Sequence, residues 1–241
     1  LESLLAQAET KQAILDAISR PAERVVPWYE YRERFLTEKR ILQGTDFWIA
    51  HGEALRRIPD PNVAASVVGI LGVETSFGRI TGRYRVIDAL ATLAFDYPPR
   101  SDFFRSELQQ FLLLSREESV DPRTALGSYA GAMGAPQFIS SSYRSYAIDG
   151  DGNGKRDLWN SWDDVIGSVA NYFKVFGWQT GQPTHYPVAF DSTRLDKDVL
   201  LAPDILPSFN VESFTAKGGL LDAEGQKHIG KLALIELQNG D

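Results

Sequence analysis

The sequence predicts a mainly α fold of the α+β class, in which a long helical part precedes a small β-rich part. Apolar residues recur at the 3.6-residue period of a helix through the first half of the chain. From about Thr180 this period is lost, and Pro, Gly and β-forming residues replace it. The chain has 241 residues, 43% of them apolar and none of them Cys, so its core must be stable without disulfides. We expect a helical domain at 1–60, a core at 61–180, and a small β-rich subdomain with a C-terminal segment at 181–241.

Three helices are expected in the first third of the chain. The first covers 1–20, where Pro21 ends the run. A charged and aromatic helix follows over 28–43. Asp60 and Pro61 resemble an N-cap followed by Pro at the first helical position, so a third helix is expected over 62–78. The apolar positions that keep the period in the first helix are Leu1, Leu4, Leu5, Ala8, Leu15 and Ile18.

The later elements follow from the same signals. Ser101 begins a helix rich in Phe and Leu, and the pair Asp121-Pro122 begins a further short one. A helix is also expected from Ser161 to Phe176, closed by a glycine. The segment 229–238 is either a final strand or a short helix.

Composition excludes several classes of function. The net charge is −7, whereas a protein that neutralises phosphates is normally basic, so a nucleic-acid role is disfavoured. The chain contains no apolar run of the length that a membrane-spanning helix needs. His51, His185 and His228 are far apart and lack HExxH spacing, which argues against a His-based zinc enzyme.

Glu74 is a carboxyl group at the end of an otherwise apolar segment. It follows SVVGILGV, so the carboxyl is expected to lie against apolar groups. Such burial raises the pKa of a carboxyl, which suits an acid that donates a proton near neutral pH. The alternatives are an exposed acid at a helix end and an acid paired with Arg79 or Arg83. Spacing alone leaves these alternatives open.

The loop DGDGNGKRD at 149–157 matches the front of the EF-hand calcium loop. Asp149, Asp151 and Asn153 take positions 1, 3 and 5, and Gly154 takes position 6. Lys155 would offer its backbone carbonyl at position 7. Hard oxygen ligands at alternate positions of a tight turn converge on one point, so a structural Ca²⁺ is expected here.

The back of this loop departs from the EF-hand pattern. Asn160 takes position 12, where the pattern has a bidentate Glu, so Asp163 or Asp164 would close a longer loop. Asp164 also fits a capping box with Ser161. A turn built from Asx-Gly pairs is the alternative for the whole loop.

The stretch GSYAGAMGAPQFISSSY at 127–143 is a third candidate site. Its small residues permit close approach of the backbone, and Ser128 and Gln137 are polar groups that can line a cleft. Small residues equally permit tight helix packing, which is the alternative interpretation.

Four blocks of the chain resemble the lytic murein transglycosylases of the membrane-bound B type. The blocks are AISRPAERVVPWYEYRERFLTEKRI, GILGVETSFGRITGRYRVIDALATLAFDYPPRSDFF, GSYAGAMGAPQFISSSYRSYAIDGDGNGKRDLW and IGSVANYFKVFGW, and they cover most of residues 13–178. The resemblance implies a lysozyme-like catalytic core flanked by a helical domain and a small β domain. It also implies cleavage of the β-1,4 bond between N-acetylmuramic acid and N-acetylglucosamine in peptidoglycan, leaving a 1,6-anhydro ring.

The resemblance assigns roles to individual residues. Glu74, in the GVET segment, would be the single catalytic residue. The residues that would line the sugar sites are Ser128, Gln137, Tyr172 and Tyr29. The residues that would bind a structural Ca²⁺ are Asp149, Asp151, Asn153, Lys155 and Asp164.

A single carboxyl suffices for such a reaction when the nucleophile belongs to the substrate. Most glycosidases need two carboxylates, and no second acid is evident in the GVETSFG segment. Glu74 would protonate the glycosidic oxygen and then, as a carboxylate, take the proton of the muramic C6 hydroxyl as that oxygen attacks C1. Ser128 and Gln137 would hold the N-acetyl and sugar groups.

The resemblance also sets the expected surroundings of the protein. Its partners would be peptidoglycan glycan strands and other cell-wall enzymes, in the periplasm, either soluble or anchored to the outer membrane through an N-terminus outside this chain. Family members continue past the β domain into a Tyr/Asn-bearing segment that completes the cleft wall, and we find no such segment before Asp241. The alternatives to an enzyme are a non-catalytic, calcium-stabilised peptidoglycan-binding module and a scaffold in a cell-wall complex.

Overall fold

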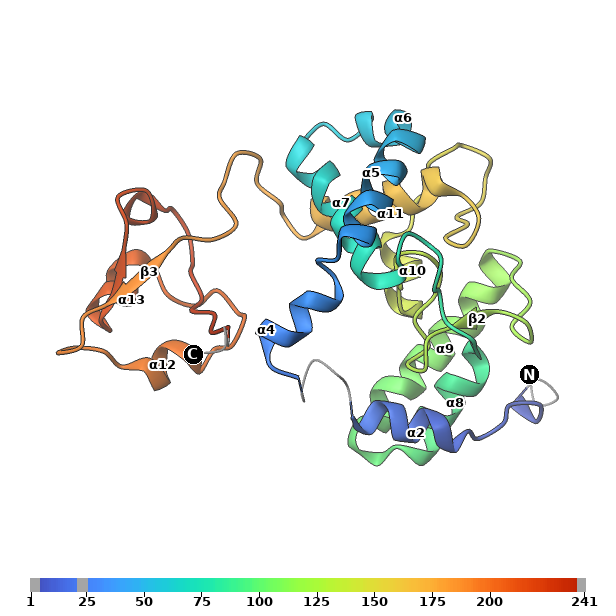
Figure 1. Cartoon of the computed structure of the whole chain (residues 1–241). Coiled ribbons are helices and arrows are strands. Elements are labelled where there is room, and N and C mark those ends of the chain that lie inside the picture. The colour runs from blue at the N-terminus through green and yellow to red at the C-terminus, as the bar shows by residue number, and fades with distance from the viewer. Residues whose placement is uncertain (1–4, 21–25, 238–241) are drawn as a thin grey trace. The chain divides into compact units, whose positions relative to one another are not determined.

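The computed structural model describes residues 5–20 and 26–237, and these fall into two compact units (Figure 1). The units divide between Trp178 and Gln179. The described elements are mainly helices with a few short strands, which confirms the predicted fold class. The three-part division at positions 60 and 180 stays a prediction, and helices from both sides of position 60 lie in the first unit.

Nine α-helices lie in the described part of the first unit. They are α2 (Gln12–Ser19), α4 (Trp28–Tyr31), α5 (Glu38–Ala50), α6 (Gly52–Arg56), α7 (Pro61–Thr75), α8 (Val86–Asp96), α9 (Ser101–Glu117), α10 (Ser140–Tyr146) and α11 (Trp162–Val175). In Figure 1, α2 lies beside α8, and α8 packs against α9. No helix of residues 5–20 and 26–237 is long and apolar enough to cross a membrane.

The first helix is shorter than the period predicts. Leu1, Leu4 and Pro21 lie outside the described residues, and α2 begins only at Gln12. The chain before it is held by α8, because the Glu9 N–H donates to Asp88 Oδ1 at 3.0 Å and the Lys11 N–H donates to Thr92 Oγ1 at 3.1 Å. These bonds use backbone groups that a longer helix would need.

The single helix predicted over 28–43 is wrong. The chain forms α4 and a 3₁₀ turn η1 (Arg32–Arg34), and then starts α5 at Glu38. The break has a local cause, because Thr37 is the N-cap of α5 and its hydroxyl accepts from the Arg40 N–H at 3.2 Å.

The elements around the centre of the first unit follow the sequence signals more closely. Helix α7 begins at Pro61, and Asp60 caps it by accepting from the Asn62 N–H at 2.8 Å. Helix α9 begins at Ser101 as predicted, whereas α8 was not predicted. Between α8 and α9 lies the 3₁₀ turn η2 (Pro98–Arg100).

The short helix predicted at Asp121-Pro122 is a turn. The Asp121 carbonyl accepts from the N–H groups of Thr124 and Ala125, and the chain then enters strand β2 (Leu126–Gly127). Strand β1 (Tyr84–Arg85) pairs with β2 in antiparallel register. The residues after the turn therefore pair as a strand and do not extend it into a helix.

The second unit contains the predicted small β element together with short helices. Strand β3 (Val188–Phe190) pairs with β4 (Gly219–Leu221) in antiparallel register. The other elements are α12 (Lys197–Leu201), α13 (Val211–Ala216) and the 3₁₀ turn η3 (Gly225–Lys227). Its core consists of Leu200, Phe214, Leu221 and Leu234.

The final segment, expected to be a strand or a short helix over 229–238, is neither in its described residues. Residues 229–237 carry one isolated bridge, between Leu232 and Phe209. Gln238 lies outside the described residues.

Candidate active site

Glu74 lies in the last turn of α7, one residue before the helix ends. Its side chain is exposed, yet desolvation by the surrounding protein raises the pKa of its carboxyl. Within the described residues, no hydrogen bond or ion pair engages this side chain. Arg79 donates to the Ser76 carbonyl at 3.1 Å, and the Arg83 guanidinium lies over the Tyr84 ring. Neither Arg79 nor Arg83 forms an ion pair with Glu74, so the alternative of an acid paired with one of these arginines is wrong.

The chain makes an unusual turn directly after Glu74. Ser76, Phe77 and Gly78 have φ angles of 51°, 59° and 76°, so three consecutive residues are left-handed. Non-glycine residues rarely adopt this conformation, and it persists only where surrounding contacts hold it. The Phe77 N–H donates to the Leu71 carbonyl at 2.9 Å, which closes the end of α7.

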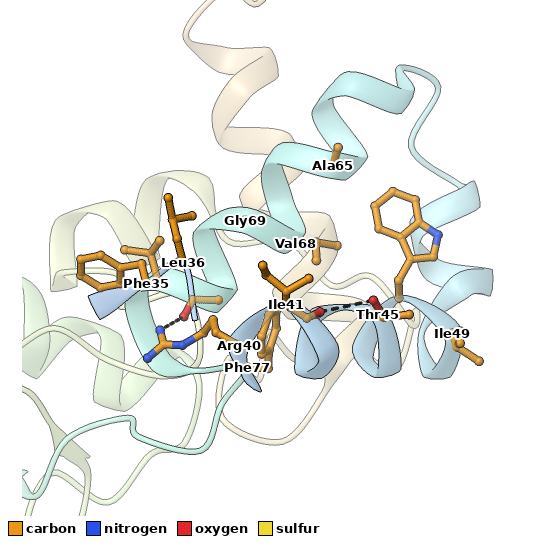
Figure 2. Close-up of a pocket in the computed structure, with 14 residues that line it drawn as sticks. Phe35, Leu36, Arg40, Ile41, Thr45, Ile49, Ala65, Val68, Gly69 and Phe77 are labelled. Carbon is orange, nitrogen blue, oxygen red and sulfur yellow. Dashed lines mark hydrogen bonds between the residues drawn. The ribbon is translucent and has the colours of Figure 1, made fainter. Parts of the chain in front are cut away.

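The ring of Phe77 accounts for part of this backbone conformation. Phe77 is one of the residues that line an apolar groove between α5 and α7, which has a volume of about 520 Å³. Figure 2 shows these lining residues. The ring stacks on Phe47 at 5.4 Å and lies over two glycines, Gly44 and Gly72. A Cβ atom added to Gly72 would lie 2.9 Å from the ring. Arg40 spans the same groove and donates to the Gly72 carbonyl.

The segment 127–138 contains both predicted polar sugar-site residues. Gln137, itself left-handed with φ of 53°, donates its side-chain N–H₂ to the carbonyls of Thr81 at 3.1 Å and Gly134 at 2.9 Å. The Ser128 hydroxyl oxygen accepts from the N–H groups of Ala130 and Ala132. With these bonds made, the side-chain oxygen of Gln137 can still accept a hydrogen bond from a ligand, and the hydroxyl hydrogen of Ser128 can still donate one.

A buried threonine, Thr75, joins this segment to the helix that carries Glu74. The Thr75 hydroxyl donates to the Ala135 carbonyl at 2.8 Å. The structure therefore brings the turn of Glu74 against the segment of Gln137, although about 60 residues separate them in the chain. The sequence does not predict this role for Thr75, because the one signal it offers is that Thr75 directly follows Glu74 in the GVET segment.

Tyr172 lies on α11 in a row of aromatic rings. Its ring centroid is 4.4 Å from Phe176, 5.2 Å from Tyr146 and 6.0 Å from Phe138. Phe138 directly follows Gln137, so the row adjoins the Gln137 segment. Sequence reasoning missed the other three rings, although the spacing of Tyr172 and Phe176 is the i,i+4 spacing of one helix face.

Tyr29 lies on α4 and is half-buried. Its hydroxyl is hydrogen-bonded to Glu30, which raises the pKa of the phenol. Among the described residues, no contact joins Tyr29 to Glu74 or Gln137, so its role at a sugar site stays a prediction.

Three acids of the EF-hand-like loop converge. Asp149, Asp151 and Asp164 each offer a carboxylate oxygen, and these oxygens lie within 4.8 Å of one another. Asp164 is fully buried and accepts from the Gly150 N–H at 2.7 Å and the Asp157 N–H at 2.7 Å. Asp163 instead forms an ion pair with Arg57. The geometry therefore favours Asp164 over Asp163 as the residue that closes the loop.

The remaining loop residues are ordered by bonds within the loop. The Asp149 carboxylate accepts from the N–H groups of Gly154 at 2.7 Å and Gly152 at 2.7 Å, which lowers the pKa of Asp149. The Asn153 side-chain oxygen accepts from the Lys155 N–H at 2.9 Å. Several anionic and neutral oxygens around one buried carboxylate match the hard donor set of Ca²⁺.

The Asp164 alternative of a capping box is half right. Ser161 caps α11, since its hydroxyl oxygen accepts from the Asp164 N–H at 3.3 Å. The Asp164 carboxylate does not complete the box, because it accepts from residues of the acidic loop.

An unpaired carboxyl of raised pKa in a mainly α unit, beside a segment that bears Ser128 and Gln137, is the arrangement that a general acid needs. The chain belongs to the Transglycosylase SLT domain family, whose model matches residues 1–234. It is 43% identical over 196 residues to the Membrane-bound lytic murein transglycosylase B of Escherichia coli (strain K12), a match that covers 75% of this chain. The same match covers 53% of that relative, so the chain spans about half of its length.

Two solved structures confirm the mainly α transglycosylase fold. The soluble lytic transglycosylase SltB1 from Pseudomonas aeruginosa is 48% identical, with a TM-score of 0.80, and the match covers 92% of this chain and 74% of that one. The Escherichia coli lytic transglycosylase Slt35 in complex with calcium is 35% identical, with a TM-score of 0.81, covering 99% of this chain and 74% of that one.

Proposed function

We propose that the protein is a peptidoglycan lytic transglycosylase. It cleaves the β-1,4 bond between N-acetylmuramic acid and N-acetylglucosamine and forms 1,6-anhydromuramic acid. The observation that carries this proposal is Glu74, whose carboxyl has a raised pKa and no partner among the described residues. Such an acid stays protonated at a higher pH than an ordinary carboxyl, which favours proton donation.

In this reaction Glu74 acts twice. The protonated carboxyl gives its proton to the glycosidic oxygen, and N-acetylglucosamine leaves as the bond to the muramic C1 breaks. The resulting carboxylate then takes the proton of the muramic C6 hydroxyl while that oxygen bonds to C1. The 1,6-anhydro ring closes, Glu74 is protonated again, and no water is consumed.

The neighbouring groups support substrate binding. Among residues 5–20 and 26–237, no hydrogen bond engages the side-chain oxygen of Gln137 or the hydroxyl hydrogen of Ser128, so these atoms can accept from and donate to N-acetyl and sugar groups. Tyr172 supplies an exposed ring, and we assign Tyr29 to the same set on the strength of the family resemblance. Aromatic rings with a polar tip suit the mixed apolar and hydroxylated surface of sugars.

The proposal includes a structural Ca²⁺ in the acidic loop. The residues that would hold it are Asp149, Asp151, Asn153, Lys155 (through its carbonyl) and Asp164. Support comes from the converging carboxylates and from the calcium complex of Slt35. The ion would order the loop against the start of α11 and takes no part in the proton transfers.

The substrate sets where the protein works. Because peptidoglycan lies outside the cytoplasmic membrane, we place the protein in the periplasm, acting on glycan strands. The name of the Escherichia coli relative describes that protein as membrane-bound.

Digestion of purified sacculi tests the proposal. The full-length protein should release 1,6-anhydromuropeptides, identified by mass, whereas products with a reducing muramic end would show a hydrolase instead. Glu74→Gln should keep the fold and lose at least 100-fold in activity. A fully active Glu74→Gln variant would disprove the catalytic assignment.

A further inference from the structure

We propose that Thr75 is the positioning residue of this site. Its buried hydroxyl fixes the last turn of α7, and thereby the carboxyl of Glu74, relative to the segment that carries Gln137. This inference rests on the proposed function and adds a residue that acts through Glu74 without touching substrate.

The hydroxyl of Thr75 is used in both directions. It donates to the Ala135 carbonyl at 2.8 Å and accepts from the Gly78 N–H at 2.9 Å. The side chain is 1% exposed, so water cannot replace either partner. One hydroxyl thus joins the end of α7, the left-handed turn after it and the 134–138 segment.

Helix geometry connects this hydroxyl to Glu74. Adjacent residues of an α-helix point about 100° apart, so fixing the direction of one side chain fixes that of the next. The end of a helix frays unless its carbonyls find partners. The Thr75 carbonyl accepts from the Ile80 N–H at 2.9 Å, so both its backbone and its side chain anchor the last turn.

The turn is held on its other sides by contacts that do not involve Gln137. The Ser76 hydroxyl donates to the Gln43 side-chain oxygen of α5 at 3.1 Å. Gly78 lies against Trp162 at the start of α11, where an added Cβ would come within 2.7 Å of the ring. Together with Phe77 in Figure 2, these residues fix the turn to α5 and α11. Two hydrogen bonds reach the Gln137 segment from this side: the Thr75 hydroxyl donates to the Ala135 carbonyl, and the Gln137 side chain donates to the Thr81 carbonyl beyond the turn, so the Thr75 bond is the one of the two that starts on α7 beside Glu74.

That segment is short and internally braced. Ala135 and Gln137 are two residues apart, and the Gln137 amide donates to the Gly134 carbonyl. The Thr75–Ala135 bond therefore joins this segment directly to the helical turn of Glu74, whereas the Gln137–Thr81 bond joins it to the chain beyond the turn. Loss of the hydroxyl leaves a carbonyl and an N–H without their partner, and both would pull the turn toward a new arrangement.

Thr75→Val tests the inference, with Thr92→Val as the matched control. Thr92 is also fully buried, and its hydroxyl bridges two segments by accepting from the Lys11 N–H at 3.1 Å and donating to the Glu9 carbonyl at 3.4 Å. Both variants remove the same atoms from an equally buried bridge, but only Thr75 adjoins Glu74.

We expect Thr75→Val to lower kcat on sacculi about 10- to 100-fold with KM changed less than about 3-fold, because small misplacements of an acid cost rate. The pH at which kcat falls should move down, since a less constrained Glu74 is better hydrated. Thr92→Val should lose stability with kcat within about 2-fold of the wild type. Thr75→Ser, which keeps the hydroxyl, should restore most of kcat.

A Thr75→Val variant as active as Thr92→Val would overturn the inference, as would a Thr75→Ser variant as impaired as Thr75→Val. If circular dichroism shows that Thr75→Val does not fold, Thr75→Ala compared with Thr75→Ser decides in the same way. Failure of the wild type to release anhydro products would instead overturn the proposed function.

Discussion

The carboxylate of Asp164 accepts a hydrogen bond from the backbone N–H of Gly150 at 2.7 Å, which ties the start of α11 to the acidic loop. Its other oxygen accepts from the Asp157 N–H at 2.7 Å. Both ends of the loop are therefore held by one fully buried side chain. These two bonds fix the carboxylate of Asp164 beside those of Asp149 and Asp151.

Asp164→Asn should destabilise the protein by about 1–3 kcal/mol, because one backbone N–H would then face the side-chain N–H₂ in a buried place. Urea unfolding measures the loss. Asp163→Asn is the control, since it removes only an exposed ion pair with Arg57, and its effect should be clearly smaller. Equal losses in the two variants would contradict the role given to Asp164.

Calcium should raise the melting temperature, and a chelator should lower it, because an ion that binds only the folded state stabilises it by mass action. The gain is about 2.7 kcal/mol at an ion concentration 100 times the dissociation constant. Thermal melts with EGTA and with added Ca²⁺ measure the shift. Asp149→Asn should abolish most of the response, and a wild-type melt insensitive to both additions would exclude the site.

The calcium response should also weaken in acid. Backbone N–H groups, first that of Gly154, hold the pKa of Asp149 below its ordinary value, so its carboxylate persists to lower pH than a free one. Its contribution is therefore present above the unfolded-state pKa and is lost as pH falls through the lower folded-state pKa. Calcium titrations from pH 7 down to about pH 3 should show binding disappear together with this protonation.

Glu74→Gln should raise the melting temperature at pH 8 while abolishing activity. Desolvation raises the pKa of Glu74 in the folded state, so the charged form costs stability once the pH exceeds the unfolded-state pKa. Below that pKa both states bind the proton, and the advantage of the variant should vanish near pH 4. A difference in melting temperature that does not depend on pH would contradict the assigned environment.

Gly72→Ala should destabilise the protein and lower its activity, because the new Cβ would lie 2.9 Å from the Phe77 ring that braces the turn. Gly69→Ala is a matched control on the same helix, where an added Cβ meets nothing within 4 Å. Its higher helix propensity should stabilise by roughly 0.5–1 kcal/mol. Unfolding by urea and sacculus digestion separate the two variants, and equal behaviour would contradict the bracing role of Phe77.

Local signals in the sequence predict local structure well. Asp60 and Pro61 predict the start of α7, where the Asp60 side chain does cap the helix. The spacing of the acidic loop predicts three oxygens at one point, and the structure brings them together. Each of these features depends on residues within about 15 positions of one another.

Features that depend on distant residues escape such signals. The start of α2 is set by Asp88 and Thr92, which lie about 80 positions further along the chain. The Thr75–Ala135 bond joins residues 60 positions apart, so only the folded structure shows that Glu74 and Gln137 lie on segments that are bonded to each other. Likewise, the sequence alone does not tell whether Asp163 or Asp164 closes the acidic loop, because that depends on the ion pair between Asp163 and the distant Arg57.

Trp162 and Asp164 stand two residues apart on α11, the first against Gly78 in the turn after Glu74 and the second inside the acidic loop. The first turn of α11 therefore contacts both the turn after Glu74 and the acidic loop. Substitutions that disrupt the acidic loop would also loosen the start of α11. The turn after Glu74 would then lose its contact with Trp162. We expect sequence change in the loop to be accompanied by compensating change around Trp162.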